Sequence, residues 1–176
     1  MTRDPAWLRE HIVDVADFPV DGIVFKDLTP LLADVDAFRF AVDALADHYA
    51  GTGVDRVVGI EARGFVLAAP LAYRLGVGMV PARKPDKLPR ATVRQDYALE
   101  YGTDALEMHD DAVQPGERVL IIDDVLATGG TAEAAAALIS STGAHVMGIG
   151  FLMELAFLSG RRRLDGHDVH SVLVYE

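Results

Sequence analysis

The sequence contains no cysteine, which excludes disulfides, thiolate catalysis and cysteine-bound metals. Its six histidines show no HExxH or comparable spacing, so we expect no dedicated metal site of that kind. No apolar run reaches the length of a membrane span, and the N-terminus, MTRDPAWLREHI, is charged and amphipathic rather than a signal peptide. These absences predict a cytoplasmic protein that has no membrane association.

Positive charge is also scarce. The chain has 16 Lys and Arg residues against 27 Asp and Glu residues, a net charge of −11, which argues against binding to nucleic acid. Any site for an anion must therefore be local. One short segment concentrates positive charge, with Arg83, Lys84, Lys87, Arg90 and Arg94. The run Arg161 to Arg163 is interpreted as a solvated basic stretch.

The 176 residues are enough for one domain with a proper core, and we expect a single domain over 1–176. Apolar strand patterns alternate with helical ones, which predicts an α/β fold with a mainly parallel twisted sheet and helices on both faces. Expected helices cover Pro5 to Val15, Asp36 to Tyr49 with Asp36 as N-cap, and Gly64 to Leu75, with a kink at Pro70. The polar stretch Lys84 to Gln95 has the composition of a mobile loop.

The most informative segment is Val119 to Thr131, VLIIDDVLATGGT. VLII is typical of a strand buried on both faces, and Asp123 and Asp124 are expected where that strand leaves the sheet, the edge at which open α/β folds bind ligands. A run of small residues follows, and an alanine-rich helix begins after it: Ala127, Thr128, Gly129, Gly130 and Thr131. Exposed N–H groups at a helix N-terminus suit a phosphate monoester, while the two acids can accept hydrogen bonds from vicinal ribose hydroxyls. The segment predicts a site for ribose 5-phosphate.

A plainer interpretation is an ordinary strand, turn and helix with a glycine-rich connection. The paired acids and the two threonines favour the functional interpretation. The segment contains neither GxxxxGK[ST] nor GxGxxG, so it does not predict an NTPase or a dinucleotide-binding site.

This segment resembles the phosphoribosyl-diphosphate motif of the type I phosphoribosyltransferase family. Four further segments resemble the adenine-specific members of that family in the same order, so the similarity covers nearly the whole chain from about Phe18: GIVFKDLTPLL (Gly22 to Leu32), GIEARGF (Gly59 to Phe65), RKPDKLP (Arg83 to Pro89) and YALEYGTDALEMHDDA (Tyr97 to Ala112). The resemblance implies a small base-binding hood, to which residues 1–32 contribute, and a mobile active-site loop over 84–101. It implies purine salvage, in which adenine and 5-phosphoribosyl 1-diphosphate give AMP and pyrophosphate.

The resemblance also implies where the diphosphate binds. Glu61, Ala62, Arg63 and Gly64 would cradle the pyrophosphate, in a loop that contains a non-proline cis peptide in related enzymes. Arg63 would stabilise the negative charge that develops on the leaving group. The alternative is a structural ion pair between Glu61 and Arg63. A second cationic group would close over the diphosphate, with a solvated loop as the alternative: Arg83, Lys84 and Lys87.

For the base, the family implies a pocket that uses Val24, Phe25, Lys26 and Leu155. Backbone C=O and N–H groups can read adenine, so lysine at position 26, where relatives commonly have arginine, weakens that recognition little. Val24 and Leu155 could sandwich the ring or belong to the core. Glu100 is the candidate for handling the purine proton, unless it faces solvent on a strand, and Tyr101 would contact the base or the closed loop.

The expected catalytic residues are Glu100, Arg63, Asp123 and Asp124, although we assign ribose contacts rather than general-base duty to the two aspartates. Mg²⁺ is expected as a substrate-bound cofactor, held mainly by diphosphate oxygens, ribose hydroxyls and water. The family further suggests a homodimer in which part of the loop reaches the neighbouring site. Two alternatives remain: the same fold acting on xanthine, guanine or orotate, and a regulator that binds the sugar diphosphate without catalysis.

Overall fold

The computed structural model describes residues 4–98 and 102–176 of the chain. Its centre is a five-stranded sheet in the order β4-β3-β7-β8-β9, in which every neighbouring pair is parallel. The strands are β3 (Arg56–Ile60), β4 (Gly78–Ala82), β7 (Arg118–Leu126), β8 (His145–Leu155) and β9 (Val169–Tyr175). The strand order reverses between β3 and β7, which is the point at which open α/β sheets form their ligand crevice.

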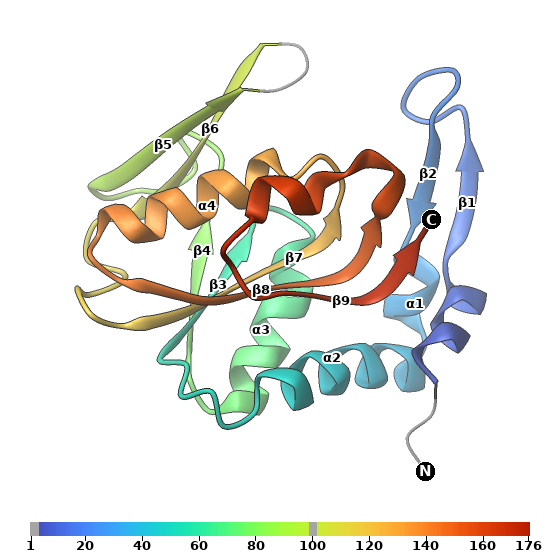
Figure 1. The fold of residues 1–176 in the computed structure, drawn as a ribbon, viewed down its shortest axis with the longest axis horizontal. Helices are drawn as coiled ribbons and strands as arrows, with labels where there is room; N and C mark the ends of the chain where they lie inside the picture. The colour runs from blue at the N-terminus through green and yellow to red at the C-terminus, as the bar shows by residue number, and fades with distance from the viewer. Residues whose placement is uncertain (1–3, 99–101) are drawn as a thin grey trace.

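Helices cover both faces of this sheet (Figure 1). α2 (Val35–Tyr49) and α3 (Gly64–Leu75) lie on one face, and α4 (Gly130–Ser141) lies on the other. The core is correspondingly divided. Leu45, Leu67 and Leu120 belong to a cluster beneath α2 and α3, whereas Ile121, Leu138 and Phe151 belong to a cluster beneath α4. Consecutive residues of β7 thus point into opposite clusters, and the predicted α/β architecture with a buried parallel sheet is confirmed.

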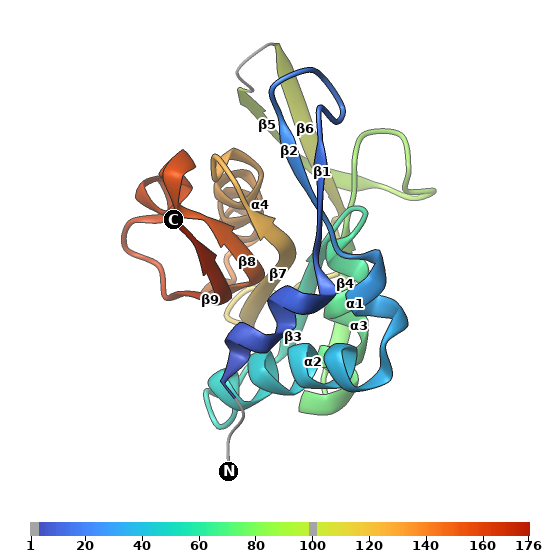
Figure 2. The same cartoon turned by 90° about the vertical axis from the view of Figure 1, so that its right-hand side faces the viewer.

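Two antiparallel hairpins stand apart from the sheet. One joins β1 (Val13–Ala16) to β2 (Val24–Asp27), and the other joins β5 (Thr92–Ala98) to β6 (Thr103–His109). Both project beyond the same end of the molecule, as two perpendicular views agree (Figures 1 and 2). The remaining elements are short: η1 (Pro5–His11), α1 (Thr29–Ala33), η2 (Ala156–Leu158) and η3 (Gly160–Leu164). Among the described residues, no helix is both long and apolar enough to cross a membrane.

Three expected elements differ from the structure. The N-terminal helix is a 3₁₀ helix that ends at His11, because the chain then enters β1 and pairs with β2. The N-cap of α2 is Asp34 rather than Asp36, since the Asp34 side chain accepts hydrogen bonds from the N–H groups of residues 36 and 37. The expected loop over 84–95 is shorter, because β5 begins at Thr92 and pairs along its whole length with β6.

Candidate functional site

The β7–α4 connection is built much as its sequence predicts. β7 continues past the two acids to Leu126, because residues 125 and 126 still pair with β8. The prediction that the acids mark the end of the strand was therefore wrong by two residues. Gly129 follows with φ of 83° and forms the N-cap of α4. This left-handed conformation explains the glycine. Within the described residues, the N–H groups of residues 128–131 donate no hydrogen bond. These donors meet the requirement for an anion site at a helix N-terminus.

The two acids of β7 have different surroundings. Asp124 is only 5% exposed, and its Oδ2 lies 2.7 Å from the Nε of Arg63. Asp123 is half-buried and accepts a hydrogen bond from the N–H of Asp124 at 2.8 Å. Burial raises the pKa of Asp123 well above its usual value near 3.8, the negative charge of Asp124 raises it further, and Arg63 partly opposes both effects. These effects disfavour a negative charge on Asp123 beside that of Asp124.

The loop after β3 meets the end of β7 directly. The Glu61–Ala62 peptide bond is cis, which confirms the expectation drawn from the family resemblance. Gly64 begins α3, and a Cβ built at this position would lie 2.8 Å from the carbonyl oxygen of Ile122 and 2.9 Å from Oδ1 of Asp123. Only glycine permits this approach without displacement of backbone. Residues 61–64 and the paired acids consequently lie side by side where β3 and β7 end.

Glu61 and Arg63 do not pair with each other, so the structural ion pair that we kept as an alternative is wrong. Glu61 instead accepts hydrogen bonds from the Nε and Nη2 atoms of Arg83, at 3.2 and 3.0 Å, and from the backbone N–H of Lys84 at 2.8 Å. The Arg83 hydrogen bonds lower the pKa of Glu61, against the effect of its partial burial. Glu61 thereby fixes the start of the cationic loop beside the loop that holds Arg63.

Carboxylates neutralise most of the short segment that concentrates positive charge. Arg83 pairs with Glu61, and Lys84 with Asp104, whereas the exposed Arg90 pairs with Asp111 at 2.6 Å. Burial alone would lower the pKa of Lys84, but its hydrogen bonds to Asp104 and Tyr97 raise it overall, so the ammonium group stays charged. An anionic ligand must therefore compete with Glu61 and Asp104 for these cations, since the segment is not an unopposed positive field.

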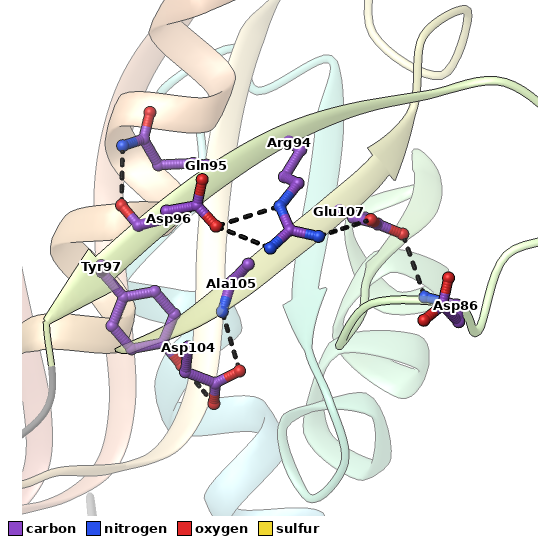
Figure 3. A network of polar contacts seen from close by, with 8 residues as sticks. All are labelled: Asp86, Arg94, Gln95, Asp96, Tyr97, Asp104, Ala105 and Glu107. Atoms are coloured by element: carbon purple, nitrogen blue, oxygen red, sulfur yellow. Dashed lines mark hydrogen bonds and ion pairs between the residues drawn. The ribbon is translucent and has the colours of Figure 1, made fainter. Parts of the chain in front are cut away.

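Figure 3 shows how the β5–β6 hairpin holds the other side of this loop. The guanidinium group of Arg94 lies between Asp96, at 2.7 Å, and the buried Glu107, at 3.6 Å. The second carboxylate oxygen of Glu107 accepts a hydrogen bond from the N–H of Asp86 at 3.3 Å. Backbone hydrogen bonds in both directions between Arg83 and Glu107 complete the attachment. The predicted diphosphate loop is thus tied to the sheet and to the hairpin.

Tyr97, on the same hairpin, links this loop to the phosphate loop. Its hydroxyl lies 2.6 Å from the Nζ of Lys84, 3.2 Å from Oδ2 of Asp104 and 3.4 Å from Oγ1 of Thr131. Figure 3 shows the Tyr97 ring beside Asp104. Neither Tyr97 nor Asp104 was predicted as a site residue, because these contacts depend on the register of the hairpin rather than on a motif.

The residues of the expected base pocket lie on β2 and at the end of β8. Phe25 packs under the guanidinium group of Arg63, 5.0 Å from ring centroid to Cζ. Lys26 points to the other face of β2, where it pairs with Asp14 at 2.6 Å and lies over the ring of Tyr175. Strand alternation places the 52% exposed Val24 on the face of Lys26.

Leu155 ends β8 and is the register partner of Tyr175, whose ring Lys26 contacts. The side chain of Leu155 is only partly buried and packs at the edge of the cluster beneath α2 and α3. This arrangement connects the end of β8 to β2 through Tyr175. Glu100 and Tyr101, the expected proton-handling pair, lie outside the described residues.

One segment that sequence reasoning missed supports the phosphate loop. A Cβ at Gly160 would lie 2.1 Å from the carbonyl oxygen of Ala127 and 2.8 Å from the nitrogen of Gly129. Next to it, Arg161 binds the buried Glu154 through hydrogen bonds of 2.5 to 3.2 Å, so the interpretation of Arg161 as solvated was wrong. These hydrogen bonds lower the pKa of Glu154. Gly160 is the first residue of η3, and no local sequence signal predicts this contact.

Comparison with known proteins agrees with this geometry. Residues 31–173 match the family model described as a phosphoribosyl transferase domain. A protein of Solibacter usitatus (strain Ellin6076) named adenine phosphoribosyltransferase is 57% identical over 96% of this chain and 98% of its own.

Solved structures give the same result. The crystal structure of adenine phosphoribosyltransferase from Thermoanaerobacter pseudethanolicus is 51% identical, covers 97% of this chain and 99% of its own, and superposes with a TM-score of 0.95. The Saccharomyces cerevisiae enzyme, complexed with adenine and an imino-altritol bisphosphate, is 36% identical, covers 98% and 99%, and has a TM-score of 0.91.

Proposed function

Because the chain belongs to the phosphoribosyl transferase domain family, we infer that it is a purine-salvage enzyme that transfers the phosphoribosyl group of 5-phosphoribosyl 1-diphosphate to adenine, giving AMP and pyrophosphate. The structural feature that best supports this function is the set of N–H donors at residues 128–131. These donors follow the paired acids of β7, at the point where the strand order of the sheet reverses. Relatives that share more than half of their residues with this chain along nearly its whole length are named adenine phosphoribosyltransferase. These names support adenine as the base.

For the sugar, we propose that residues 127–131 bind the 5-phosphate and that the two acids accept the ribose hydroxyls. The N–H groups and the hydroxyls of Thr128 and Thr131 are donors, and the N-terminal end of the α4 dipole favours negative charge. Asp123 is the more exposed of the two acids, whereas Asp124 is buried and held by Arg63. The support for this assignment is therefore stronger for a direct contact by Asp123 than for one by Asp124.

For the leaving group, we propose that Glu61–Gly64 and the loop from Arg83 to Lys87 receive the diphosphate. Arg63 is 46% exposed at its side chain, so its remaining N–H donors can reach a ligand while Nε stays on Asp124. Glu61 is itself negative, and its proposed contribution is to fix Arg83 and the N–H of Lys84 rather than to touch the diphosphate. Donors placed in advance stabilise the charge that develops as the bond at C1′ breaks.

For the base, we propose the crevice between β2 and the end of β8. Phe25 faces Arg63 and therefore the proposed reaction centre, which makes its ring the better candidate for stacking on adenine than Val24. Leu155 supplies the apolar side opposite. The Lys26 side chain points away, so residue 26 would read the base through its backbone, and this explains why lysine can replace arginine there.

The chemistry passes through an oxocarbenium-like state at C1′, which the enzyme favours by orienting both reactants and excluding water. We propose that Glu100 accepts or orients the purine proton and that Tyr101 contacts the base or the closed loop. Both residues lie outside the described part of the chain.

We propose Mg²⁺ as a substrate-bound cofactor. The fit rests on donor chemistry: the half-buried Asp123 offers hard carboxylate oxygens beside the proposed diol, while the ion pair with Arg63 occupies Asp124. One carboxylate suits an ion that keeps most of its ligands from substrate and water. The cation would neutralise charge on the departing diphosphate.

We propose that residues 1–176 act as one domain, with 1–32 forming the hood and 84–101 closing over the ligand. We propose a homodimer, which light scattering of the purified protein would test directly. A cytoplasmic location stays a prediction from the sequence.

A base-panel assay tests the function. The protein is incubated with 5-phosphoribosyl 1-diphosphate and Mg²⁺, each nucleobase is offered separately, and the nucleotide product is identified. AMP alone is expected. A product from xanthine, guanine or orotate would change the assigned base, and no product with any base would favour a regulator that binds the sugar diphosphate.

A further inference from the structure

The hydroxyl of Tyr97 contacts residues of two proposed subsites that lie far apart in the sequence. Lys84 belongs to the proposed diphosphate loop, and Thr131 belongs to the proposed 5-phosphate loop, 47 positions further along the chain. The Tyr97 hydroxyl lies 2.6 Å from the former and 3.4 Å from the latter. It is therefore within hydrogen-bonding distance of a side chain from each loop.

The Tyr97 ring is held as firmly as its hydroxyl. Position 97 pairs with Asp104 in the hairpin, and the carboxylate of Asp104 binds both the Tyr97 hydroxyl and the Lys84 ammonium group. The ring also lies beneath Lys84, 5.2 Å from Nζ to its centroid. A Cβ at Gly130 would lie 3.8 Å from the ring, so the hairpin packs directly on the first turn of α4. Movement of Tyr97 therefore moves one loop relative to the other.

The proposed substrate has one anionic group at each end of a ribose. A ligand that engages two subsites binds much more tightly than either half only if the spacing of the subsites matches the ligand. We propose, resting on the proposed function, that Tyr97 is a positioning residue that sets the spacing between the diphosphate loop and the 5-phosphate loop. It acts through Lys84 and Thr131 and not as a ligand of the reacting atoms.

The proposal separates ligands by the number of subsites they touch. Inorganic pyrophosphate engages the diphosphate loop alone, AMP engages the 5-phosphate loop without the diphosphate loop, and 5-phosphoribosyl 1-diphosphate engages both. In Tyr97→Phe, which keeps the ring and loses the hydroxyl, we expect binding of the sugar diphosphate to weaken by about tenfold, while pyrophosphate and AMP each bind within about twofold of wild type. Calorimetric titration in Mg²⁺ measures all three.

Tyr73→Phe is the matched control, because Tyr73 is 89% exposed on α3 and, among the described residues, its hydroxyl makes no hydrogen bond to either loop. It should leave all three affinities unchanged. An equal loss for the three ligands in Tyr97→Phe, no loss for any, or a loss confined to pyrophosphate or to AMP would overturn the proposal. The KM for the sugar diphosphate should rise more than kcat falls.

A second variant keeps the test decisive if Tyr97→Phe folds poorly. Thr131→Val removes the hydroxyl that contacts Tyr97. The double variant Tyr97→Phe/Thr131→Val should lose less affinity for the sugar diphosphate than the sum of the two single losses, because both substitutions remove the same Tyr97–Thr131 contact. Additive losses would contradict a shared link. If the wild-type protein binds all three ligands but makes no AMP from adenine, the proposed function is wrong, while the affinities of Tyr97→Phe still test the positioning role of Tyr97. If the wild-type protein does not bind the sugar diphosphate, the proposed function and the positioning role are both wrong.

Discussion

The Nε of Arg63 lies 2.7 Å from Oδ2 of Asp124, which joins the loop after β3 to the last part of β7. Asp124 is almost fully buried, whereas nearly half of the Arg63 side chain is exposed. The carboxylate therefore orients a cation that still has donors available for a ligand. The paired acids consequently have two roles: one faces the proposed sugar, and the other fixes the arginine proposed to receive the diphosphate.

Asp124→Asn should lower kcat/KM for the sugar diphosphate by about ten- to a hundredfold, because Arg63 loses the charged partner that orients it. Steady-state kinetics with adenine saturating measures the effect. Asp111→Asn is the control, since it breaks the Arg90–Asp111 pair, in which both side chains are exposed, and should leave kcat/KM unchanged. An unchanged kcat/KM in Asp124→Asn would contradict the orienting role.

Asp123 should make stability depend on pH in an unusual direction. The pKa of Asp123 is raised in the folded state, so folding favours the protonated carboxyl group. The resulting contribution to the free energy of unfolding is fully present at pH values below the ordinary pKa near 3.8. It is lost as the pH rises through the raised pKa of the folded state. Asp123→Asn should therefore be more stable than wild type at pH values above that window, yet bind the sugar diphosphate less well. Urea denaturation at several pH values measures the first effect. A stability difference that does not vary with pH would contradict the raised pKa.

Thr128→Ala should weaken AMP binding by about 1 to 3 kcal/mol if the exposed hydroxyl donates a charge-assisted hydrogen bond to the phosphate. Isothermal titration with AMP checks this value. Thr142→Ala, at the opposite end of α4, removes a hydroxyl that bonds only to the carbonyl of Ile139 and should leave AMP affinity unchanged. Equal affinity in Thr128→Ala and wild type would exclude the contact.

Gly160→Ala should distort the phosphate loop, because the new Cβ would overlap the backbone of Ala127 and Gly129, which cannot turn away as a flexible side chain could. We expect AMP binding to weaken at least about tenfold, with a loss of stability of about 1 to 3 kcal/mol from overpacking. Gly78→Ala is the control, since the atoms nearest to its Cβ would belong to the Arg56 side chain, at 3.5 Å or more. Normal AMP affinity in Gly160→Ala would show that the contact does not shape the loop.

Glu100→Gln should slow turnover more than it weakens binding of the sugar diphosphate, because the amide cannot accept the purine proton. Pre-steady-state kinetics and a binding titration separate the two quantities. Equal effects on turnover and binding would argue against proton handling by Glu100.

The sequence predicted what depends on local pattern. The apolar run before Asp123, the two glycines and the alanine-rich helix fixed the strand, loop and helix, because each signal lies within a few residues of the structure it describes. Family resemblance placed Arg63 and Lys84 near the site. Their partners were not predictable: the Asp124 and Asp104 contacts arise from separate strands, and charge alone gives no information on which carboxylate a cation meets.

The same limit explains the errors. Arg161 was interpreted as solvated because it stands in a run of three arginines, yet Glu154 is buried and needs a cation. Asp36 and Asp34 are equally good N-cap residues in sequence, and only the backbone conformation selects Asp34. Gly160 carries no local signal of its contact, since the reason for a glycine there lies 31 positions away, at Gly129.

We propose that the N–H groups of residues 128–131 bind the 5′-phosphate of the nucleotide while Asp123 accepts a hydrogen bond from a ribose hydroxyl. A crystal structure of the protein with AMP measures this directly. We expect phosphate oxygens within about 3 Å of these N–H groups and a ribose hydroxyl on Asp123. AMP bound elsewhere, with the β3–β7 crevice free of nucleotide, would contradict it.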